Sequence, residues 1–431
     1  MMIETLTPPV AGDPGGHAGS WIKRLNGNEK RTLAASFGGY GVDAFDYYTL
    51  PLVTPILLTL WSVSKTEIGL IGTATLVSSA LGGWLAGILA DRYGRVRILQ
   101  LTILVFAVFT FACGLSQTPG QLMLARSLQG LGFGGEWAVG SVLIAETIKA
   151  KHRGKAAGLV QSSWAIGWAA SAVAFWGLYS VLPPETAWKV LFWIGILPAV
   201  LILYIRRNLD EPPVYLAEQA RAKARGERAS FLRIFSPALL RNTVLASLLA
   251  TGMQGAYYSV TTWLPTFLKT ERHLSVLGTS GYLLVLISGS FAGYLTSAWL
   301  CDAIGRRRCF ILFALMGGIL VLAYTQMPIT DGLMLVLGFP LGFFLSGIFS
   351  GMGAFLSELF PSDVRGSGQG FCYNIGRALG AACPALIGSF STQYPLGQTL
   401  GWMAALCYGL VIVAALALPE TRGRELAPAP A

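Results

Sequence analysis

A short charged stretch, Gly87-Ile88-Leu89-Ala90-Asp91-Arg92-Tyr93-Gly94-Arg95-Val96-Arg97, lies between two long apolar runs. Its spacing returns in the second half of the chain, where Asp302, Gly305 and Arg306 correspond to Asp91, Gly94 and Arg95. Further pairs keep nearly the same offset: Glu146 and Glu358, Arg153 and Arg365, and Glu211 and Glu420. Several matches in register predict a chain built from two similar halves rather than from short stacked repeats.

Hydrophobic residues dominate the composition. They make up 54% of the 431 residues, whereas charged residues make up only 12%, about half the charged share of an ordinary soluble domain. Apolar runs of roughly 20 residues, long enough to cross a bilayer as a helix, occur six times in each half. The expected spans are 33–60, 67–90, 98–116, 121–145, 156–181, 188–205, 241–268, 277–300, 309–327, 331–356, 367–391 and 400–418. The sequence therefore predicts an all-α membrane protein with twelve transmembrane helices in two six-helix bundles.

The basic residues fall in alternate loops. Most of the 31 Lys and Arg residues lie in the tails and in the loops near 92–97, 149–155, 206–241 and 306–308, whereas the opposite loops hold only Lys65, Lys189, Lys269 and Arg272. Because Lys and Arg concentrate in cytoplasmic loops, this asymmetry predicts that both termini are cytoplasmic. It also explains the net charge of +10. We therefore expect the basic residues to lie at a lipid bilayer, and we do not expect the protein to bind nucleic acid.

The same pattern divides the chain into five segments. We expect a cytoplasmic tail at 1–32, a six-helix bundle at 33–205, a cytoplasmic linker at 206–240, a second bundle at 241–418 and a cytoplasmic tail at 419–431. The first 30 residues lack an apolar core of the signal-peptide type, so no cleaved signal is expected. The six cysteines have no metal-ligand spacing, and the sequence indicates neither a metal site nor a disulfide.

Ionisable residues inside the predicted spans are the main functional signal. They are Asp43 and Asp46 in the first span, Arg126 and Glu136 in the fourth and Arg377 in the eleventh, with Gln129 and Asn374 nearby. A charged side chain at the centre of the bilayer costs about 2.5 to 3.5 kcal/mol on insertion scales. Each group therefore either joins neighbouring helices in a structural pair or lines a hydrated cavity, and the sequence alone leaves both interpretations open.

Together, several motifs resemble the major facilitator superfamily over about residues 33–423: the repeated loop, the Arg126-Ser127-Leu128-Gln129-Gly130 run and the terminal Pro419-Glu420-Thr421-Arg422-Gly423. The resemblance implies two bundles around a central site, with alternating access by rocking of the halves. Three stretches are similar to the sialate and monocarboxylate proton symporters and the aromatic-acid symporters: Asp43-Ala44-Phe45-Asp46, Gly134-Gly135-Glu136-Trp137 and Asn208-Leu209-Asp210-Glu211-Pro212. The seventh span departs from the lactate-permease members, because it holds Gln254, Tyr257 and Tyr258 and no charge.

The buried charges suggest how such a protein would work. All three histidines lie outside the predicted spans, so proton coupling would rest on carboxyl groups, and the candidates are Asp43, Asp46 and Glu136. Desolvation favours a neutral carboxyl group and a nearby cation favours a charged one, so an acid that alternates between an arginine and water can load and release a proton. The candidate substrate-binding residues are Arg126, Gln129, Asn374, Arg377, Tyr47 and Gln254, with an arginine holding the substrate carboxylate. No cofactor is expected, because the proton gradient would drive transport.

The charged loops form a candidate cytoplasmic gate. Its residues are Gly87, Asp91, Arg95, Arg97, Glu146, Arg153, Asp302, Gly305, Arg306, Glu358 and Arg365. Exposed ion pairs are individually weak, but a network that forms in only one conformation shifts the equilibrium toward that conformation. We expect these residues to stabilise the outward-facing state.

The sequence thus predicts proton-coupled uptake of a small organic acid anion by a monomeric transporter of the inner (plasma) membrane. Two alternatives stay open, a sugar or polyol proton symporter and an exporter of organic anions. The ending at 419–423 favours the sugar porter, whereas the buried arginines do not. A receptor that no longer transports would be expected to carry an added signalling domain. An enzyme is not expected, because the sequence holds no nucleophile, metal or phosphate-binding motif.

Overall fold

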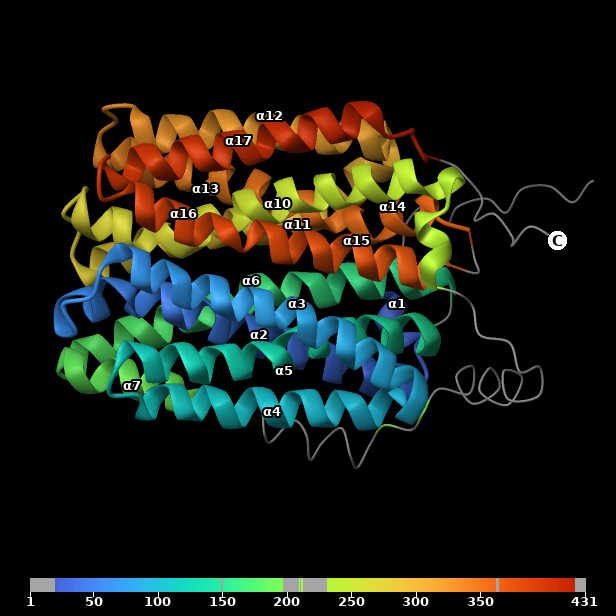
Figure 1. The fold of residues 1–431 in the computed structure, drawn as a ribbon, viewed down its shortest axis with the longest axis horizontal. Helices are drawn as coiled ribbons and strands as arrows, with labels where there is room; N and C mark the ends of the chain where they lie inside the picture. The colour runs from blue at the N-terminus through green and yellow to red at the C-terminus, as the bar shows by residue number, and fades with distance from the viewer. Residues whose placement is uncertain are drawn as a thin grey trace, which may run out of the picture.

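The chain folds into two groups of long helices that lie side by side (Figure 1). The computed structural model describes residues 20–148, 150–196, 209, 211, 231–361 and 364–422, and no strand occurs among these residues. One group comes from each half of the chain, as the repeated loop predicts. The predicted all-α fold with two helical bundles is confirmed.

The N-terminal half begins with one short turn and continues in long helices. In the described residues these are α1 (Ser20–Lys23), α2 (Gly27–Leu60), α3 (Lys65–Tyr93), α4 (Arg95–Leu115), α5 (Pro119–Thr147), α6 (Ala150–Val181) and α7 (Pro184–Ile194). The predicted sixth span is described only to residue 196, and the predicted linker at 206–240 lies mostly outside the described residues. The five predicted segment boundaries therefore stay predictions.

The C-terminal half repeats this arrangement with more interruptions. Its described elements are η1 (Phe231–Phe235), α10 (Pro237–Thr270), α11 (Val276–Ile304), α12 (Arg306–Gln326), α13 (Asp331–Gly347), η2 (Ile348–Gly351), α14 (Met352–Leu359), α15 (Arg365–Gly380), α16 (Ala382–Phe390) and α17 (Leu396–Ala417). The predicted eleventh span is divided into α15 and α16. Proline has no N–H group for the carbonyl four residues earlier, and Pro384 stands four residues after Gly380, where α15 ends.

Two of the N-terminal helices begin with a reciprocal cap. At the start of α2, Asn26 accepts a hydrogen bond from the backbone of Glu29, and the Glu29 carboxylate accepts one from the backbone of Asn26, both at 2.8 Å. Ser64 and Glu67 form the same arrangement at the start of α3. Such caps satisfy backbone donors that have no partner within the helix, so these side chains define where each span begins.

The repeated charged loop has the same backbone in both halves. Gly94 joins α3 to α4 with φ of 110°, and Gly305 joins α11 to α12 with φ of 101°, a conformation that favours glycine. The Glu211 carboxylate accepts hydrogen bonds from the first backbone N–H groups of α4, at 2.8 Å from Arg95. Glu420 does the same for α12, at 2.9 Å from Arg306. The sequence repeat is therefore also a structural repeat, with a carboxylate at each helix N-terminus.

Glycines bring the central helices of each half into close contact. A Cβ atom on Gly134 of α5 would lie only 1.6 Å from the carbonyl oxygen of Ser79 in α3. In the second half, a Cβ atom on Gly342 of α13 would lie 1.8 Å from the carbonyl oxygen of Leu286 in α11. No side chain larger than hydrogen fits at these crossings. Each half thus uses the same close helix approach, which small residues permit inside membranes.

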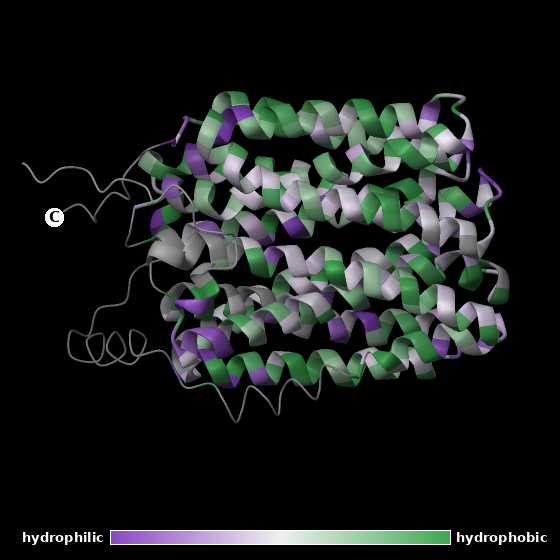
Figure 2. Cartoon of the chain, turned by 180° about the vertical axis from the view of Figure 1, so that it is seen from behind, coloured by the Kyte–Doolittle hydropathy of each residue, from purple (hydrophilic) through white to green (hydrophobic). Residues whose placement is uncertain are grey.

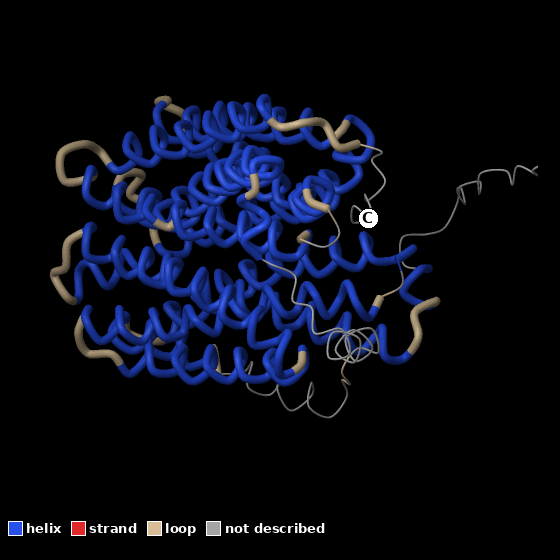
Figure 3. Tube along the Cα trace, turned by 45° about the vertical axis from the view of Figure 1, so that its right-hand side comes forward, coloured by secondary structure: helices blue, strands red, loops and turns tan. Residues whose placement is uncertain are grey.

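The outer surface of the helices is suited to lipid. Seven of the described helical segments are long and apolar enough to cross a membrane, judged by length and composition. Hydrophobic residues dominate along the helices, and hydrophilic residues are more frequent toward the helix ends (Figure 2). Large hydrophobic side chains such as Leu81, Leu124 and Leu406 are exposed. The described loops connect helices that run nearly parallel to one another (Figure 3). The two ends of the described chain, α1 and the segment after α17, lie at the same end of the bundles (Figure 1).

The two halves pack tightly at the opposite end. A Cβ atom on Gly69 of α3 would lie 2.7 Å from the carbonyl oxygen of Pro384 in α16. The hydroxyl of Thr73 donates a 2.6 Å hydrogen bond to the carbonyl of Ala381. Nearer to the end that holds the described termini, a Cβ atom on Gly87 would meet no described atom within 4 Å. Contact between α3 and the second half is therefore closest at the end away from the termini.

Candidate substrate-binding site

A pocket lies between the two halves, near the middle of the long helices. We call it the central pocket, and both halves contribute to its lining: Tyr40, Tyr47, Phe133, Gln161, Trp164, Tyr257, Tyr258, Tyr294, Phe349, Tyr373 and Arg377. Its volume is about 30 Å³, which is room for very few water molecules. A molecule with several carbon atoms would need the halves to move apart around it.

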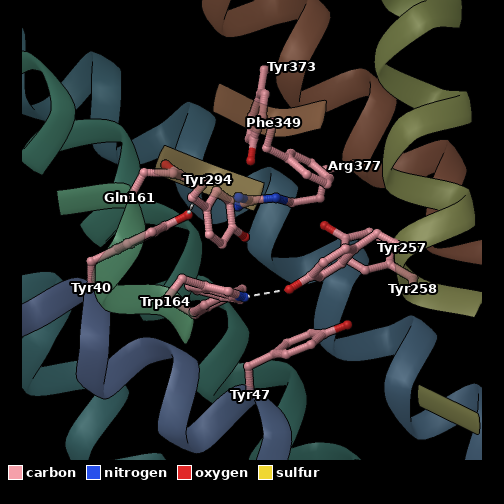
Figure 4. Close-up of a pocket in the computed structure, with 11 residues that line it drawn as sticks. Tyr40, Tyr47, Gln161, Trp164, Tyr257, Tyr258, Tyr294, Phe349, Tyr373 and Arg377 are labelled. Atoms are coloured by element: carbon pink, nitrogen blue, oxygen red, sulfur yellow. Dashed lines mark hydrogen bonds between the residues drawn. The ribbon is translucent and has the colours of Figure 1, made fainter. Parts of the chain in front are cut away.

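Arg377 on α15 is the charged member of the central pocket among its described lining residues. Its side chain is 4% exposed, and its guanidinium carbon lies 5.2 Å from the ring centre of Tyr373 and 5.5 Å from that of Phe133. It also interacts with the Tyr258 hydroxyl. Figure 4 shows the guanidinium group reaching across the pocket toward Tyr294. A planar cation among aromatic rings is well suited to bind a carboxylate.

Hydrogen-bonded aromatic side chains connect the two halves beside Arg377. The indole N–H of Trp164 on α6 donates a 2.6 Å hydrogen bond to the hydroxyl of Tyr257 on α10 (Figure 4). The Tyr257 hydroxyl also bonds to that of Tyr48 on α2. The Tyr47 hydroxyl lies 3.3 Å from the hydroxyl oxygen of Thr261. These contacts run from one half to the other, so they have to rearrange whenever the halves separate.

A second group of polar side chains lies inside the N-terminal half. Asp46 on α2 and Arg126 on α5 form an ion pair at 2.6 Å, and their side chains are only 1% and 2% exposed. The Gln129 amide donates a 2.7 Å hydrogen bond to the same carboxylate oxygen of Asp46. The predicted proton carrier Asp46 and the predicted substrate ligands Arg126 and Gln129 thus contact one another.

The ion pair supports a prediction about stability. Replacing Asp46 with asparagine leaves the Arg126 charge buried, and breaking one side of a buried pair costs about 3 to 5 kcal/mol. We expect Asp46→Asn to lower the melting temperature of the purified protein strongly, and the double variant Asp46→Asn/Arg126→Gln to recover part of the loss. Equal melting temperatures for the single variant and the wild type would contradict this interpretation of the pair.

The carboxyl groups of Asp43 and Glu136 lie close together next to this pair. They interact electrostatically, and Asp43 also interacts with Arg377 of the other half. Neither carboxyl oxygen of Asp43 has a hydrogen-bond partner of ordinary geometry among the described residues. Asp43 is fully buried and Glu136 is 6% exposed. Two acids at such a site repel each other when both are charged, so the arrangement is suited to holding a proton.

The remaining predicted substrate ligands have different surroundings. Tyr47 and Arg377 line the central pocket. Gln254 lies behind it, where its amide donates to the backbone carbonyl of Tyr373 and its oxygen accepts from the Tyr258 hydroxyl, both at 2.9 Å. Asn374 donates to the backbone carbonyl of Gly370 at 3.0 Å and faces α3 near Gly83. These assignments to the substrate stay predictions.

Most of the aromatic lining was not among the sequence-based candidates. Those aromatic residues are Tyr40, Phe133, Trp164, Tyr257, Tyr258, Tyr294, Phe349 and Tyr373, and the polar lining residue Gln161 was not a candidate either. A helical spacing does connect several of them, since Tyr40 and Tyr47 are seven apart, Gln161 and Trp164 three apart, and Tyr373 and Arg377 four apart. Residues at these spacings share one helix face. Polar aromatic residues on the same helix face as a buried charge could therefore have indicated the pocket lining.

The predicted cytoplasmic gate is only partly described. Arg306 forms an ion pair with Glu358 at 3.2 Å, and Glu358 also accepts a hydrogen bond from the Thr421 hydroxyl. Backbone groups of Arg95 and Arg97 lie next to Glu211. The side chains of the other charged gate residues, Asp91, Glu146, Arg153, Asp302 and Arg365, lie outside what the structure describes. Their role in holding the outward-facing state stays a prediction.

Comparison with known proteins assigns the chain to a family. The model of the Major Facilitator Superfamily matches residues 36–298 and 284–431. A protein of Cupriavidus pinatubonensis described as a probable 4-methylmuconolactone transporter is 41% identical, over 94% of each chain. The cis,cis-muconate transport protein of Acinetobacter baylyi is 29% identical, over 88% of this chain and 92% of that protein.

A solved structure supports the same assignment at the level of the fold. The proton:xylose symporter XylE matches with a TM-score of 0.73 at 18% identity, over 93% of this chain and 98% of that one. At this identity the likeness concerns the fold alone. With the family match over most of the chain, the conclusion is that this protein belongs to the major facilitator superfamily and is an integral membrane transporter, not an enzyme.

Proposed function

We propose that the protein is a proton-coupled symporter that takes up a small organic acid anion. The observation that carries the proposal is the position of Arg377, which is buried among aromatic rings and faces the central pocket. A buried guanidinium group attracts an anion strongly, because little water screens it. The aromatic rings provide apolar contact area for the carbon skeleton of the substrate.

The names of the relatives support an organic acid as the substrate. One relative is described as a muconolactone transporter and another as a muconate transport protein, and both names denote carboxylic acids. We place the protein in the inner (plasma) membrane as a monomer, with both termini in the cytoplasm. The clustering of basic residues in alternate loops supports this orientation.

We assign the transported proton to Asp43 and Glu136. The two carboxyl groups face each other, whereas Asp46 is held by Arg126 and Gln129. A bound proton removes the repulsion within the Asp43/Glu136 pair. No cofactor takes part, because the proton gradient supplies the driving force.

The electrostatic interaction between Arg377 and Asp43 couples the flux of the substrate to the flux of protons. Arg377 interacts electrostatically with Asp43 across the interface between the halves, and a cation favours the charged form of a nearby acid. When a substrate carboxylate binds Arg377, its negative charge offsets this influence. Asp43 and Glu136 then bind a proton more readily, so that anion and proton are loaded together.

The tight end of the interface acts as the outer closure of the pathway. Replacing Gly69 with valine would insert a side chain where even a Cβ atom would lie only 2.7 Å from the carbonyl oxygen of Pro384. Overpacking costs about 1 to 3 kcal/mol, so Gly69→Val is expected to hold this end open and to reduce uptake by about tenfold or more. In a Thr73→Cys background, labelling by a membrane-impermeant thiol reagent should become faster.

A nearby glycine provides the control for this variant. A Cβ atom on Gly72 would be 3.9 Å from its nearest contact, the Pro384 side chain, so Gly72→Ala should preserve uptake and labelling. Normal uptake in Gly69→Val, with unchanged labelling, would show that this contact does not close the pathway.

Uptake by the purified protein in liposomes tests the proposed function. With an acidic exterior, we expect labelled 4-methylmuconolactone or a similar small acid to accumulate inside, and a proton-conducting uncoupler to abolish the accumulation. Accumulation of a neutral sugar or polyol instead would favour the sugar-porter alternative. Transport of an acid only in exchange for internal acid, without any effect of the proton gradient, would contradict symport.

A further inference from the structure

We infer that Trp263 is a positioning residue that ties the outer closure of the pathway to the central pocket. The inference rests on the proposed function, because the contact between α3 and α16 is the proposed outer closure. It adds the link between this contact and the pocket, where hydrogen bonds join the two halves. Trp263 lies on α10, less than two helical turns after Tyr257, and its side chain is fully buried.

Trp263 contacts the same carbonyl group that forms the closure. Its indole N–H donates a 3.0 Å hydrogen bond to the carbonyl oxygen of Pro384 in α16. That oxygen is the atom that would lie 2.7 Å from a Cβ atom on Gly69 of α3. A Cβ atom on Gly388, one helical turn further along α16, would lie 2.5 Å from the carbonyl oxygen of Lys65 in α3 and 3.1 Å from the Trp263 ring. The indole group therefore contacts α16 at the two residues that also contact α3.

The break between α15 and α16 explains why α16 needs this support. Because Pro384 has no N–H group for the carbonyl of Gly380, α16 is held to α15 less firmly than in one continuous helix. Two side-chain hydrogen bonds fix the start of α16. Thr73 of α3 donates to the carbonyl of Ala381 at 2.6 Å, and this bond breaks when the halves separate. The bond from Trp263 lies within the C-terminal half, so it keeps α16 with α10 when the halves move.

The helix that carries Trp263 also carries the hydrogen bonds that join the halves at the pocket. The Tyr257 hydroxyl accepts a 2.6 Å hydrogen bond from the indole N–H of Trp164, and the Thr261 hydroxyl lies 3.3 Å from that of Tyr47. Rearrangement of these bonds around a substrate displaces α10, and Trp263 carries the displacement to α16. The pocket and the outer closure therefore change state together.

Thiol labelling of the full-length protein in cells tests the inference. The reporter is Gly72→Cys, because Gly72 is buried and a Cβ atom there would face the Pro384 side chain at 3.9 Å. A membrane-impermeant reagent reaches this position when α16 leaves α3, and mass spectrometry of the peptide that carries position 72 excludes the native cysteines. Trp263→Phe keeps an aromatic ring and loses the N–H group. Without substrate, it should speed labelling about fivefold, the effect of one lost hydrogen bond.

Two further forms separate the hydrogen bond from packing. Trp193→Phe is the matched control, because the Trp193 indole N–H has no hydrogen-bond partner among the described residues, and it should leave labelling unchanged. Benzothienylalanine at position 263 keeps the double ring and has no N–H group, so it should speed labelling as much as Trp263→Phe. Labelling at the wild-type rate in both forms of position 263 would overturn the inference.

A double variant tests the link to the pocket. Tyr257→Phe removes the acceptor of the bond from Trp164, so it should also speed labelling at position 72. If Trp263 carries the displacement from α10 to α16, then Tyr257→Phe/Trp263→Phe should label no faster than the faster single variant. Effects that multiply would show that the two residues act independently, and the link would be wrong.

The failure of the inference and that of the proposed function give different results, because labelling needs no substrate. If the wild type accumulates 4-methylmuconolactone with the proton gradient but both forms of position 263 label at the wild-type rate, the proposed function stands and the inference falls. If no acid is transported but labelling changes as expected, the proposed substrate and coupling are wrong and the positioning role of Trp263 stands.

Discussion

Replacing Arg377 with glutamine is expected to reduce uptake of the acid by about 30-fold or more. The substitution keeps hydrogen-bonding capacity but removes the charge of the described pocket lining. Losing one partner of a desolvated charge pair costs about 2 to 5 kcal/mol, which corresponds to this range of affinity. Arg377→Lys should retain only part of the activity, because an ammonium group cannot form the two parallel hydrogen bonds of a guanidinium group. Initial uptake rates at several substrate concentrations measure the effect.

An exposed arginine provides the control for Arg377. Arg272 pairs with Asp331 at 2.9 Å at the helix ends, with side chains 23% and 60% exposed, and exposed pairs contribute little. Arg272→Gln should therefore leave uptake nearly unchanged. If Arg377→Gln transports the acid at the wild-type rate with an unchanged apparent affinity, the substrate carboxylate binds elsewhere and the proposed site is wrong.

Neutralising Asp43 and Glu136 together is expected to abolish accumulation while preserving exchange. The variant Asp43→Asn/Glu136→Gln keeps the size of both side chains and removes both proton-binding groups. An electroneutral symporter of one proton and one monoanion accumulates substrate about tenfold per unit of pH gradient, because each tenfold ratio corresponds to 1.4 kcal/mol. The variant should reach equal concentrations inside and outside. Exchange of labelled for unlabelled acid should continue, since Arg377 is intact.

A contrary result would identify a different proton carrier. If the double variant still accumulates acid about tenfold per pH unit, neither Asp43 nor Glu136 carries the proton, and Asp46 becomes the remaining carboxyl candidate of the original three. Melting temperatures of the variants are the control, because a folded but uncoupled protein differs from an unfolded one. We expect the double variant to melt close to the wild type, unlike Asp46→Asn.

The sequence was sufficient to predict the fold because the fold depends on local patterns that can be recognised in a single sequence. Apolar runs of membrane-spanning length and the loop around Gly94, repeated around Gly305, predicted two helical halves, and the structure has the same loop in both. The correspondence between Glu211 and Glu420 in the two halves also has a structural basis, since each carboxylate lies at a helix N-terminus. The break between α15 and α16 was not predicted, because a proline within an apolar run does not by itself show whether a helix kinks or ends.

The predicted site was identified by its charges, whereas its aromatic lining was not. A buried charge is rare in a membrane span and is conspicuous in the sequence, so Arg377 and Asp43 were found. Residues such as Trp164 and Tyr257 resemble ordinary apolar packing until the halves are placed together, and their hydrogen bond joins segments far apart in the chain. Long-range contacts of this kind have no local sequence pattern.

Helical spacing also could not assign partners to the two acids of α2. Asp43 and Asp46 are three residues apart, a spacing that places both on one side of a helix. In the structure they face different parts of α5, because Asp46 contacts Arg126 and Asp43 lies near Glu136, ten residues further along that helix. Only the packing of α2 against α5 separates a structural ion pair from a pair of acids suited to carry a proton.

The measurement that tests the central claim most directly is external pH in a lightly buffered suspension of de-energised cells that produce the protein. On addition of a small monocarboxylic acid anion, proton-coupled symport predicts a transient rise in external pH, absent in the Asp43→Asn/Glu136→Gln variant. If the wild type takes up the labelled acid without any change in external pH, the acid enters without a proton and the proposed coupling is wrong.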